Sequence, residues 1–167
     1  MALATTVNTR YLKLAYTTPL VANFTMMTWF YLLASGVGNG RGIISHSNSS
    51  YESAWCYADA TTNALMVDVR SPGSSAVAGP ILPFSVWQHV AIVYWSADAS
   101  THALYAYLNG RLVATQVDTS TTLAANNQGF AVPDATFALM GYNRDVRIWN
   151  RCLTGAEIAS EFASGSP

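Results

Sequence analysis

The dipeptide Asn109-Gly110 constrains the fold more than any other feature, because it separates two runs of alternating apolar residues. A two-residue type I′ turn needs positive φ at both central positions, which Asn and Gly adopt most easily. The sequence therefore predicts a β-hairpin that reverses at these two residues. A third run, at residues 87–95, is rich in β-branched and aromatic residues and predicts a preceding strand. Because these strands are largely apolar on both faces, we expect all three in the middle of a sandwich and not at an edge.

The turn also predicts which residues of the hairpin face each other. The predicted pairs are Leu108 with Arg111, Tyr107 with Leu112, Ala106 with Val113 and Tyr105 with Ala114. In this register Tyr105, Tyr107, Leu112 and Ala114 share one face, and Leu104, Ala106, Leu108 and Val113 share the other. Both faces are apolar, so we expect other parts of the protein to cover both.

The composition indicates one domain with an excess of apolar residues. Of the 167 residues, 51% are hydrophobic and 10% are charged, whereas about 25% are charged in typical domains. No apolar run approaches the roughly 18 residues of a membrane-spanning helix. We therefore expect part of the apolar surface to contact a partner protein or further copies of the chain.

The charge pattern argues against two classes of partner. The net charge is −1, and the lone Lys13 and seven arginines are scattered along the chain. No basic stripe for nucleic acid and no polybasic patch for a membrane surface is present in the sequence. Residues 1–10 also lack the charged segment and long apolar core of a classical signal peptide.

Further apolar runs predict an all-β, antiparallel β-sandwich of about ten to twelve strands with one short C-terminal helix. Besides the three strands above, strands are expected at residues 23–33, 43–46, 51–57, 64–70, 137–141 and 145–149. The predicted organisation is an N-terminal arm at 1–10, a sandwich domain at 11–163 and a tail at 164–167.

The helix is predicted from its start signals. Thr154 and Glu157 have the spacing of a capping box, in which each side chain bonds the backbone amide of the other residue. Leu153 and Ile158 fit the hydrophobic staple that accompanies such a cap. The helix is expected to end near Phe162.

Four sequence blocks occur in the order found in a known family of sandwiches. The blocks are FTMMTW at 24–29, WQHVA at 87–91, LYAYLNGR at 104–111 and DVRIWNRCL at 145–153, with Glu157-Ile158 following. They match Phe-Thr-x-x-x-Trp, Trp-x-His-Val-Ala, Leu-x-x-Tyr-x-Asn-Gly and Asp-x-Arg-Ile-x-Asn-Arg-Ala-Leu-x-x-x-Glu-Ile. On these blocks the chain resembles laminin G-like domains of the concanavalin A-like lectin/glucanase superfamily. The resemblance implies an antiparallel jelly-roll sandwich, and because the blocks are mostly scaffold it indicates a fold more firmly than an activity.

Two cysteines, Cys56 and Cys152, leave two interpretations open: one disulfide, or two buried free thiols. Cys152 stands where the family pattern has a small Ala. The resemblance therefore favours free thiols.

The sequence offers no catalytic constellation, so we expect a protein that is not an enzyme. Hydrolases of the superfamily carry Glu-x-Asp-x-x-Glu on one strand, and the chain has no such run. Its carboxylates are scattered: Glu52 is isolated, Asp68 neighbours Arg70, and Glu157 and Glu161 lie on the predicted helix. His89 belongs to a scaffold block and is expected to be structural. His46 and His102 have no Cys or Glu at the spacing of zinc ligands.

A calcium site is the one metal site that the resemblance implies. Many laminin G-like domains hold calcium at a loop rim with carboxylate and carbonyl oxygens, ligands that suit a hard cation. In the long polar segment at 118–136, the oxygens would come from Asp118, Asn126, Asn127 and Asp134. The alternative is that these are ordinary solvated loop residues.

A glycan site would need exposed aromatic rings and a few fixed hydrogen-bonding groups. The aromatic residues near predicted strand ends or loops are Tyr51, Trp55, Tyr57, Trp95 and Tyr142. The alternative for these residues is packing in the core of an aromatic-rich sandwich.

These observations support two functions of different classes. The first is a recognition or assembly module on a virion surface, such as a capsid-decorating or tail-associated bacteriophage subunit, which contacts other subunits or itself. The second is a free-standing lectin that binds a cell-surface glycan. In both cases we expect the protein outside the cell or on a virion surface, reached without a classical signal peptide.

Overall fold

The computed structural model describes residues 3–5, 23–33, 40–47, 53–70, 76–98, 101–118, 129–130, 139 and 141–165. These residues form eleven strands and one helix. The strands are β1 (Leu3–Thr5), β2 (Phe24–Leu32), β3 (Gly40–Ser47), β4 (Ser53–Asp59), β5 (Ala64–Arg70), β6 (Val77–Ile81), β7 (Trp87–Asp98), β8 (Thr101–Leu108), β9 (Arg111–Asp118), β10 (Gly129–Phe130) and β11 (Gly141–Trp149). The helix α1 spans Gly155–Ser164.

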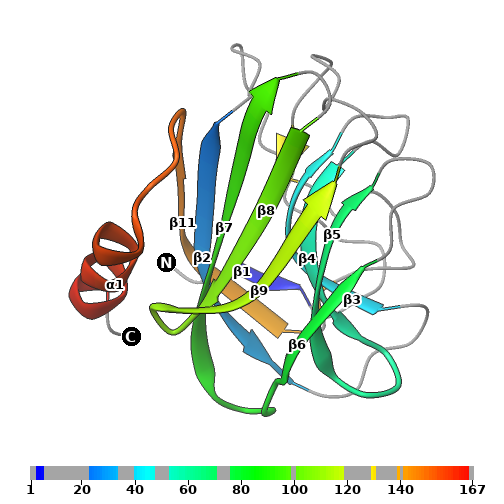
Figure 1. Cartoon of the computed structure of the whole chain (residues 1–167). Helices are drawn as coiled ribbons and strands as arrows, with labels where there is room; N and C mark the ends of the chain where they lie inside the picture. The colour runs from blue at the N-terminus through cyan, green and yellow to red at the C-terminus, as the bar shows by residue number, and fades with distance from the viewer. Residues whose placement is uncertain are drawn as a thin grey trace.

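The strands form two sheets that are stacked face to face, with α1 outside them (Figure 1). One sheet has the order β1-β11-β2-β7-β8-β9 and the other β10-β3-β4-β5-β6, and every neighbouring pair is antiparallel. The predicted all-β jelly-roll sandwich with a C-terminal helix is confirmed. Residues 3–5, in the predicted N-terminal arm, pair with β11 at one edge of the six-stranded sheet. In the described part of the chain, no helix is long and apolar enough to cross a membrane.

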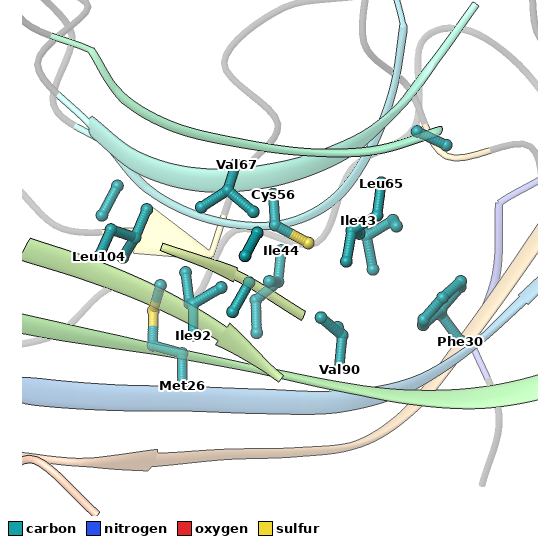
Figure 2. Close-up of a cluster of buried hydrophobic side chains, with 14 of the residues drawn as sticks. Met26, Phe30, Ile43, Ile44, Cys56, Leu65, Val67, Val90, Ile92 and Leu104 are labelled. Carbon is teal, nitrogen blue, oxygen red and sulfur yellow. The ribbon is translucent and has the colours of Figure 1, made fainter. Parts of the chain in front are cut away.

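The core lies between the sheets because alternate residues of each strand point inward. Figure 2 shows Met26, Phe30, Val90, Ile92 and Leu104 of the six-stranded sheet facing Ile43, Ile44, Cys56, Leu65 and Val67 of the five-stranded sheet. Cys56 and Cys152 are both free thiols, as the resemblance favoured. Burial raises the pKa of the Cys56 thiol, so it stays protonated and packs as a small apolar side chain.

The hairpin reverses at residues 109–110 as predicted, with positive φ at both positions. Beyond the second pair, however, the predicted register is wrong. Leu112 lies opposite Tyr107, but Ala114 and not Val113 lies opposite Ala106. A β-bulge absorbs one extra residue here, which turns Ala114 toward the core instead of placing it beside the tyrosines.

The expectation that β9 lies in the middle of a sheet is also wrong. Among the described strands, β9 pairs only with β8 and forms the edge of the six-stranded sheet. Its outward-facing Leu112 and Val117 are 52% and 68% exposed. The apolar residues of this strand therefore do not indicate cover on both sides.

The helix α1 packs on the outer face of the six-stranded sheet. The predicted capping box is present: Thr154 Oγ1 accepts from the Glu157 amide, and the Glu157 carboxylate accepts from the Thr154 amide. Leu153 and Ile158 are buried together against the sheet, as the predicted staple requires. At its other end, Glu161 accepts a hydrogen bond from Arg147 of β11. The helix is thus fixed to the sheet at both ends.

Candidate recognition surface

The outer face of the six-stranded sheet collects aromatic side chains on both sides of α1. Because side chains alternate along a strand, Trp87, His89, Val93 and Trp95 of β7 all point to this face. The helix covers the middle of β7, where Ala91 and Val93 pack with Ile158. Two regions remain beyond the helix, and we call them the aromatic pocket and the aromatic row.

The aromatic pocket has a volume of about 200 Å³ and lies at the N-terminal end of α1. Its lining residues come from β7, β8 and the segment that leads into the helix: Val93, Trp95, Tyr105, Tyr107, Cys152, Leu153, Thr154 and Gly155. Val93 pairs directly with Tyr105, so strand register brings the floor residues together. Trp95 is 39% exposed and presents part of its ring to solvent.

The pocket is electrically neutral. Its lining has no carboxylate, guanidinium or amine, and its polar groups are hydroxyls, a thiol, an indole N–H and backbone atoms. Desolvation, with a smaller contribution from Tyr105, raises the pKa of Tyr107, so this phenol stays protonated and can donate a hydrogen bond. Burial also raises the pKa of Cys152, whose thiol donates to the Tyr94 carbonyl oxygen at 3.2 Å. Cys152 is therefore a protonated thiol at neutral pH.

The aromatic row lies near the C-terminal end of α1. Strand pairing places Tyr142 of β11 opposite Tyr31 of β2, and Tyr31 opposite Trp87 of β7. The ring centroids of Tyr142 and Tyr31 are 5.8 Å apart, and those of Tyr31 and Trp87 are 5.5 Å apart. All three residues are half-buried. The row is thus a contiguous aromatic surface across three strands.

Arg144 adds a positive charge beside this row. Its guanidinium carbon lies 5.0 Å from the ring centroid of Trp87 and 5.9 Å from that of Trp29. Thr28 Oγ1 donates to the Arg144 carbonyl oxygen at 3.0 Å, which fixes the backbone where β11 begins a bulge. Arg144 Nε is buried and meets no hydrogen-bond acceptor among the described residues.

His89 lies between these two regions and has a structural role. It is 2% exposed, and its ring lies 5.3 Å from Trp29 and 5.9 Å from Phe162. Burial lowers the pKa of His89 to about 4, while Asp145 acts to raise it and Arg147 to lower it. The imidazole is therefore neutral at pH 7 and packs beneath α1.

The structure separates the predicted glycan residues instead of bringing them together. Trp95 lines the aromatic pocket, and Tyr142 belongs to the aromatic row. Trp55 and Tyr57 lie on β4 of the other sheet with their ring centroids 4.8 Å apart. Trp55 is 1% exposed and presents no ring face to a ligand in this structure. Tyr51 lies outside the described residues.

The predicted calcium ligands fall outside the described part of the structure. Asn126, Asn127 and Asp134 are not described, nor is the side chain of Asp118, the last residue of β9. Within the described ranges, no group of three or more His, Cys, Asp or Glu could hold a metal ion. The calcium prediction therefore stays a prediction.

Sequence reasoning missed Tyr31, Trp87, Tyr105, Tyr107 and Arg144. One signal was available for Tyr105 and Tyr107, which alternate on a strand that the sequence paired with its neighbour. No sequence signal joins Tyr31, Trp87 and Arg144, because their contact depends on β11 lying beside β2.

Comparison with known proteins identifies the family. The family model described as the concanavalin A-like lectin/glucanases superfamily, laminin G type, matches residues 6–159. The chain belongs to this family. No curated protein matches it by sequence.

Several solved structures share the fold at low sequence identity. A heptameric SAP-like pentraxin from Limulus polyphemus has a TM-score of 0.66 and 16% identity, over 95% of this chain and 78% of the pentraxin. Trypanosoma rangeli sialidase has a TM-score of 0.67 and 15% identity, over 98% of this chain but only 29% of the sialidase. The receptor binding domain of botulinum neurotoxin type G has a TM-score of 0.62 and 14% identity, over 86% of this chain and 38% of that domain. At these identities the likeness shows the fold alone.

Proposed function

We propose that this concanavalin A-like domain is a non-enzymatic recognition module that binds a neutral sugar ring in the aromatic pocket. The observation that supports the proposal is the pocket lining: the partly exposed Trp95 ring beside Tyr105 and Tyr107, with hydroxyl groups and no charge. Sugars bind proteins through such a combination of an apolar ring face and a few hydrogen-bonding groups. A pocket of about 200 Å³ is below the usual range for drug-sized ligands, which favours a single ring.

The arrangement of carboxylates supports a binding role and not catalysis. A glycosidase needs two carboxyl groups that flank the scissile bond, and the pocket lining has none. Near the helix, Glu157 is paired with Arg151, and both Asp145 and Glu161 are paired with Arg147. All three acids are engaged in ion pairs, an arrangement that does not favour an acid and base pair.

The proposal is tested by glycan-array screening of the whole chain, followed by calorimetric titration of the sugar that binds. Trp95→Ala should weaken binding by about tenfold, the effect of losing roughly one aromatic stacking contact. Phe84→Ala is the matched control, because Phe84 is exposed to a similar extent and lies outside the pocket. Absence of sugar binding at millimolar concentration, or equal losses in the two variants, would contradict the proposal.

A second candidate function, assembly with other protein subunits, is supported by a different observation. The edge strand β9 exposes Leu112 and Val117, and neighbouring β6 exposes Ile81. Under this proposal the chain contacts copies of itself or other subunits. A more specific version of the proposal is that it is a capsid-decorating or tail-associated subunit on a virion surface.

Sedimentation tests whether the chain assembles, and Val117→Glu should dissociate such an assembly. Detection of the chain in purified particles tests the more specific version, and also tests the proposed location outside the cell.

A further inference from the structure

We propose that the aromatic row and Arg144 form a separate binding site for a sugar that carries a carboxylate. The inference goes beyond the function proposed above, because the aromatic pocket has no charged side chain and suits a neutral ring. The two regions lie on opposite sides of α1 on one sheet face. Each can therefore be changed while the other stays intact.

The positive charge of Arg144 is not neutralised within the described part of the protein. Its guanidinium lies near the rings of Trp87 and Trp29, and the buried Nε has no acceptor among the described residues. The neighbouring carboxylates are already engaged: Arg147 bonds both oxygens of Asp145, at 2.9 and 2.8 Å, and also bonds Glu161. Arg144 therefore retains its capacity to bind an anion.

The planar shape of the Arg144 guanidinium favours a carboxylate as its ligand. A guanidinium presents N–H groups in a planar fork that matches the two oxygens of a carboxylate. Aromatic faces compensate the cation in part, but they supply no hydrogen-bond acceptor for its N–H groups. A ligand carboxylate would supply both the acceptors and the opposite charge.

The neighbouring rings favour a sugar as the carrier of that carboxylate. Tyr142, Tyr31 and Trp87 offer contiguous half-buried ring surface, on which the apolar face of a pyranose can pack. Arg144 is two residues beyond Tyr142 on β11, so both point to the same face. Charge and ring surface are thus adjacent on rigid strands, and binding need not order a loop.

The test compares two ligands that differ only at the carboxylate: methyl β-D-glucuronide and methyl β-D-glucoside, each titrated calorimetrically into the whole chain. We expect the glucuronide to bind at least about tenfold more tightly, because a charge-assisted hydrogen-bond pair distinguishes the two. Raising the salt concentration should weaken only the glucuronide. Arg144→Gln should reduce the affinity for the glucuronide to that for the glucoside, and Phe84→Ala, at an exposed ring outside both regions, should leave both affinities unchanged.

A direct readout avoids dependence on one substitution, since Arg144→Gln also removes the contacts with Trp87 and Trp29. In the ¹⁵N–¹H NMR spectrum of the unmodified chain, the Nε–H resonance of Arg144 should shift on addition of glucuronide and not of glucoside. Equal affinities, no binding of either ligand, an unshifted resonance, or a preference that survives Arg144→Gln would each overturn the inference. Binding of the glucuronide at Arg144 without binding of any neutral sugar would overturn the proposed pocket function alone.

Discussion

The aromatic pocket and the aromatic row lie on the same sheet face, but the helix between them leaves them with different electrostatics. At the N-terminal end of α1, Glu157 bonds Arg151 and the Thr154 amide, and the pocket beside it has no charged lining residue. At the C-terminal end, Arg147 engages both Asp145 and Glu161. Arg144, on the same strand, is left beside aromatic rings.

This difference shows that the ion pairs at the two ends of α1 determine which charged side chains stay available to a ligand. The ion pairs of Arg151 and Arg147 involve exposed or half-exposed groups, and such pairs contribute little to stability. Their effect on recognition is larger, because they pair three carboxylates with Arg147 and Arg151, while Arg144 has no ion pair among the described residues. Variants that disturb one region and spare the other therefore measure whether the two regions are independent.

The largest expected effect comes from Gly141→Ala, which should break the aromatic row and spare the aromatic pocket. A Cβ at this position would overlap the Tyr31 carbonyl oxygen, so β11 must move away from β2. We expect a loss of about 3 kcal/mol in the free energy of unfolding, at the upper end for overpacking. Urea denaturation measures this loss.

Gly79→Ala is the matched control for Gly141→Ala. Its Cβ would make only an ordinary contact, 3.4 Å from the Leu65 carbonyl oxygen in the other sheet. Its free energy of unfolding should change by less than about 1 kcal/mol. Similar losses of unfolding free energy in the two variants would contradict this prediction. They would show that the close approach of Gly141 to Tyr31 does not fix the position of Tyr142 in the aromatic row.

The second prediction concerns His89, which lies beneath the helix between the two regions. Its pKa is about 4 in the folded protein and 6.5 as an ordinary histidine, so the unfolded chain binds more protons between these values. The free energy of unfolding should therefore fall as the pH drops from 6.5 to 4, by up to about 3 kcal/mol, and this contribution should be constant above pH 7.

Denaturation of the original chain and of His89→Gln across this pH range isolates the histidine from the carboxylates that titrate below it. The variant should have a lower free energy of unfolding at pH 7 and a flatter dependence on pH. Asp145 and Arg147 affect the histidine in opposite directions, so neither alone sets its pKa. Identical pH slopes in the two proteins would mean that His89 is accessible to protons in the folded state.

Local chemistry made part of this fold predictable from the sequence. Asn109-Gly110 predicted the turn, and Thr154 with Glu157 predicted the helix start. Both predictions succeeded because each motif acts only on residues close to it in sequence. The bulge at Val113 was not predictable from the turn, since it depends on which face of β9 packs on the core. The edge position of β9 was missed for a related reason: apolar residues on both faces do not reveal sheet order.

The candidate sites were less predictable, because strands distant in sequence assemble them. Trp95 and Tyr142 were selected as aromatic residues near loops, yet they belong to different regions. Tyr31, Trp87 and Tyr142 meet only through the pairing of β11 with β2 and of β2 with β7. Among the described residues Arg144 has no counter-ion, because Arg147 engages both Asp145 and Glu161, and no sequence signal indicates these pairs.

A third and smaller effect is expected at the helix start, which borders only the aromatic pocket. Thr154→Ala removes the cap hydroxyl and should lower the free energy of unfolding by about 1 kcal/mol. Because Thr154 also lines the pocket, the variant should weaken neutral-sugar binding and leave the affinity for the glucuronide unchanged. Thr154→Ser, which retains the hydroxyl, should restore most of the stability. Equal losses of both ligands would show that the two regions are coupled through α1.

The smallest effect is expected for Cys152→Ala, on the pocket wall. The thiol donates a weak hydrogen bond to the Tyr94 carbonyl oxygen, and the side chain is half-buried beside Leu153 and Trp149. Its removal takes away one small apolar group, so we expect a loss below about 1 kcal/mol in urea denaturation. Alanine is also the residue that the family pattern has here. If the pocket ligand contacts Trp95 and the tyrosines, as we propose, its affinity should stay within about twofold, well below the tenfold of one aromatic contact. A larger loss of affinity would show that the ligand contacts the Cys152 thiol and does not bind mainly through the aromatic rings.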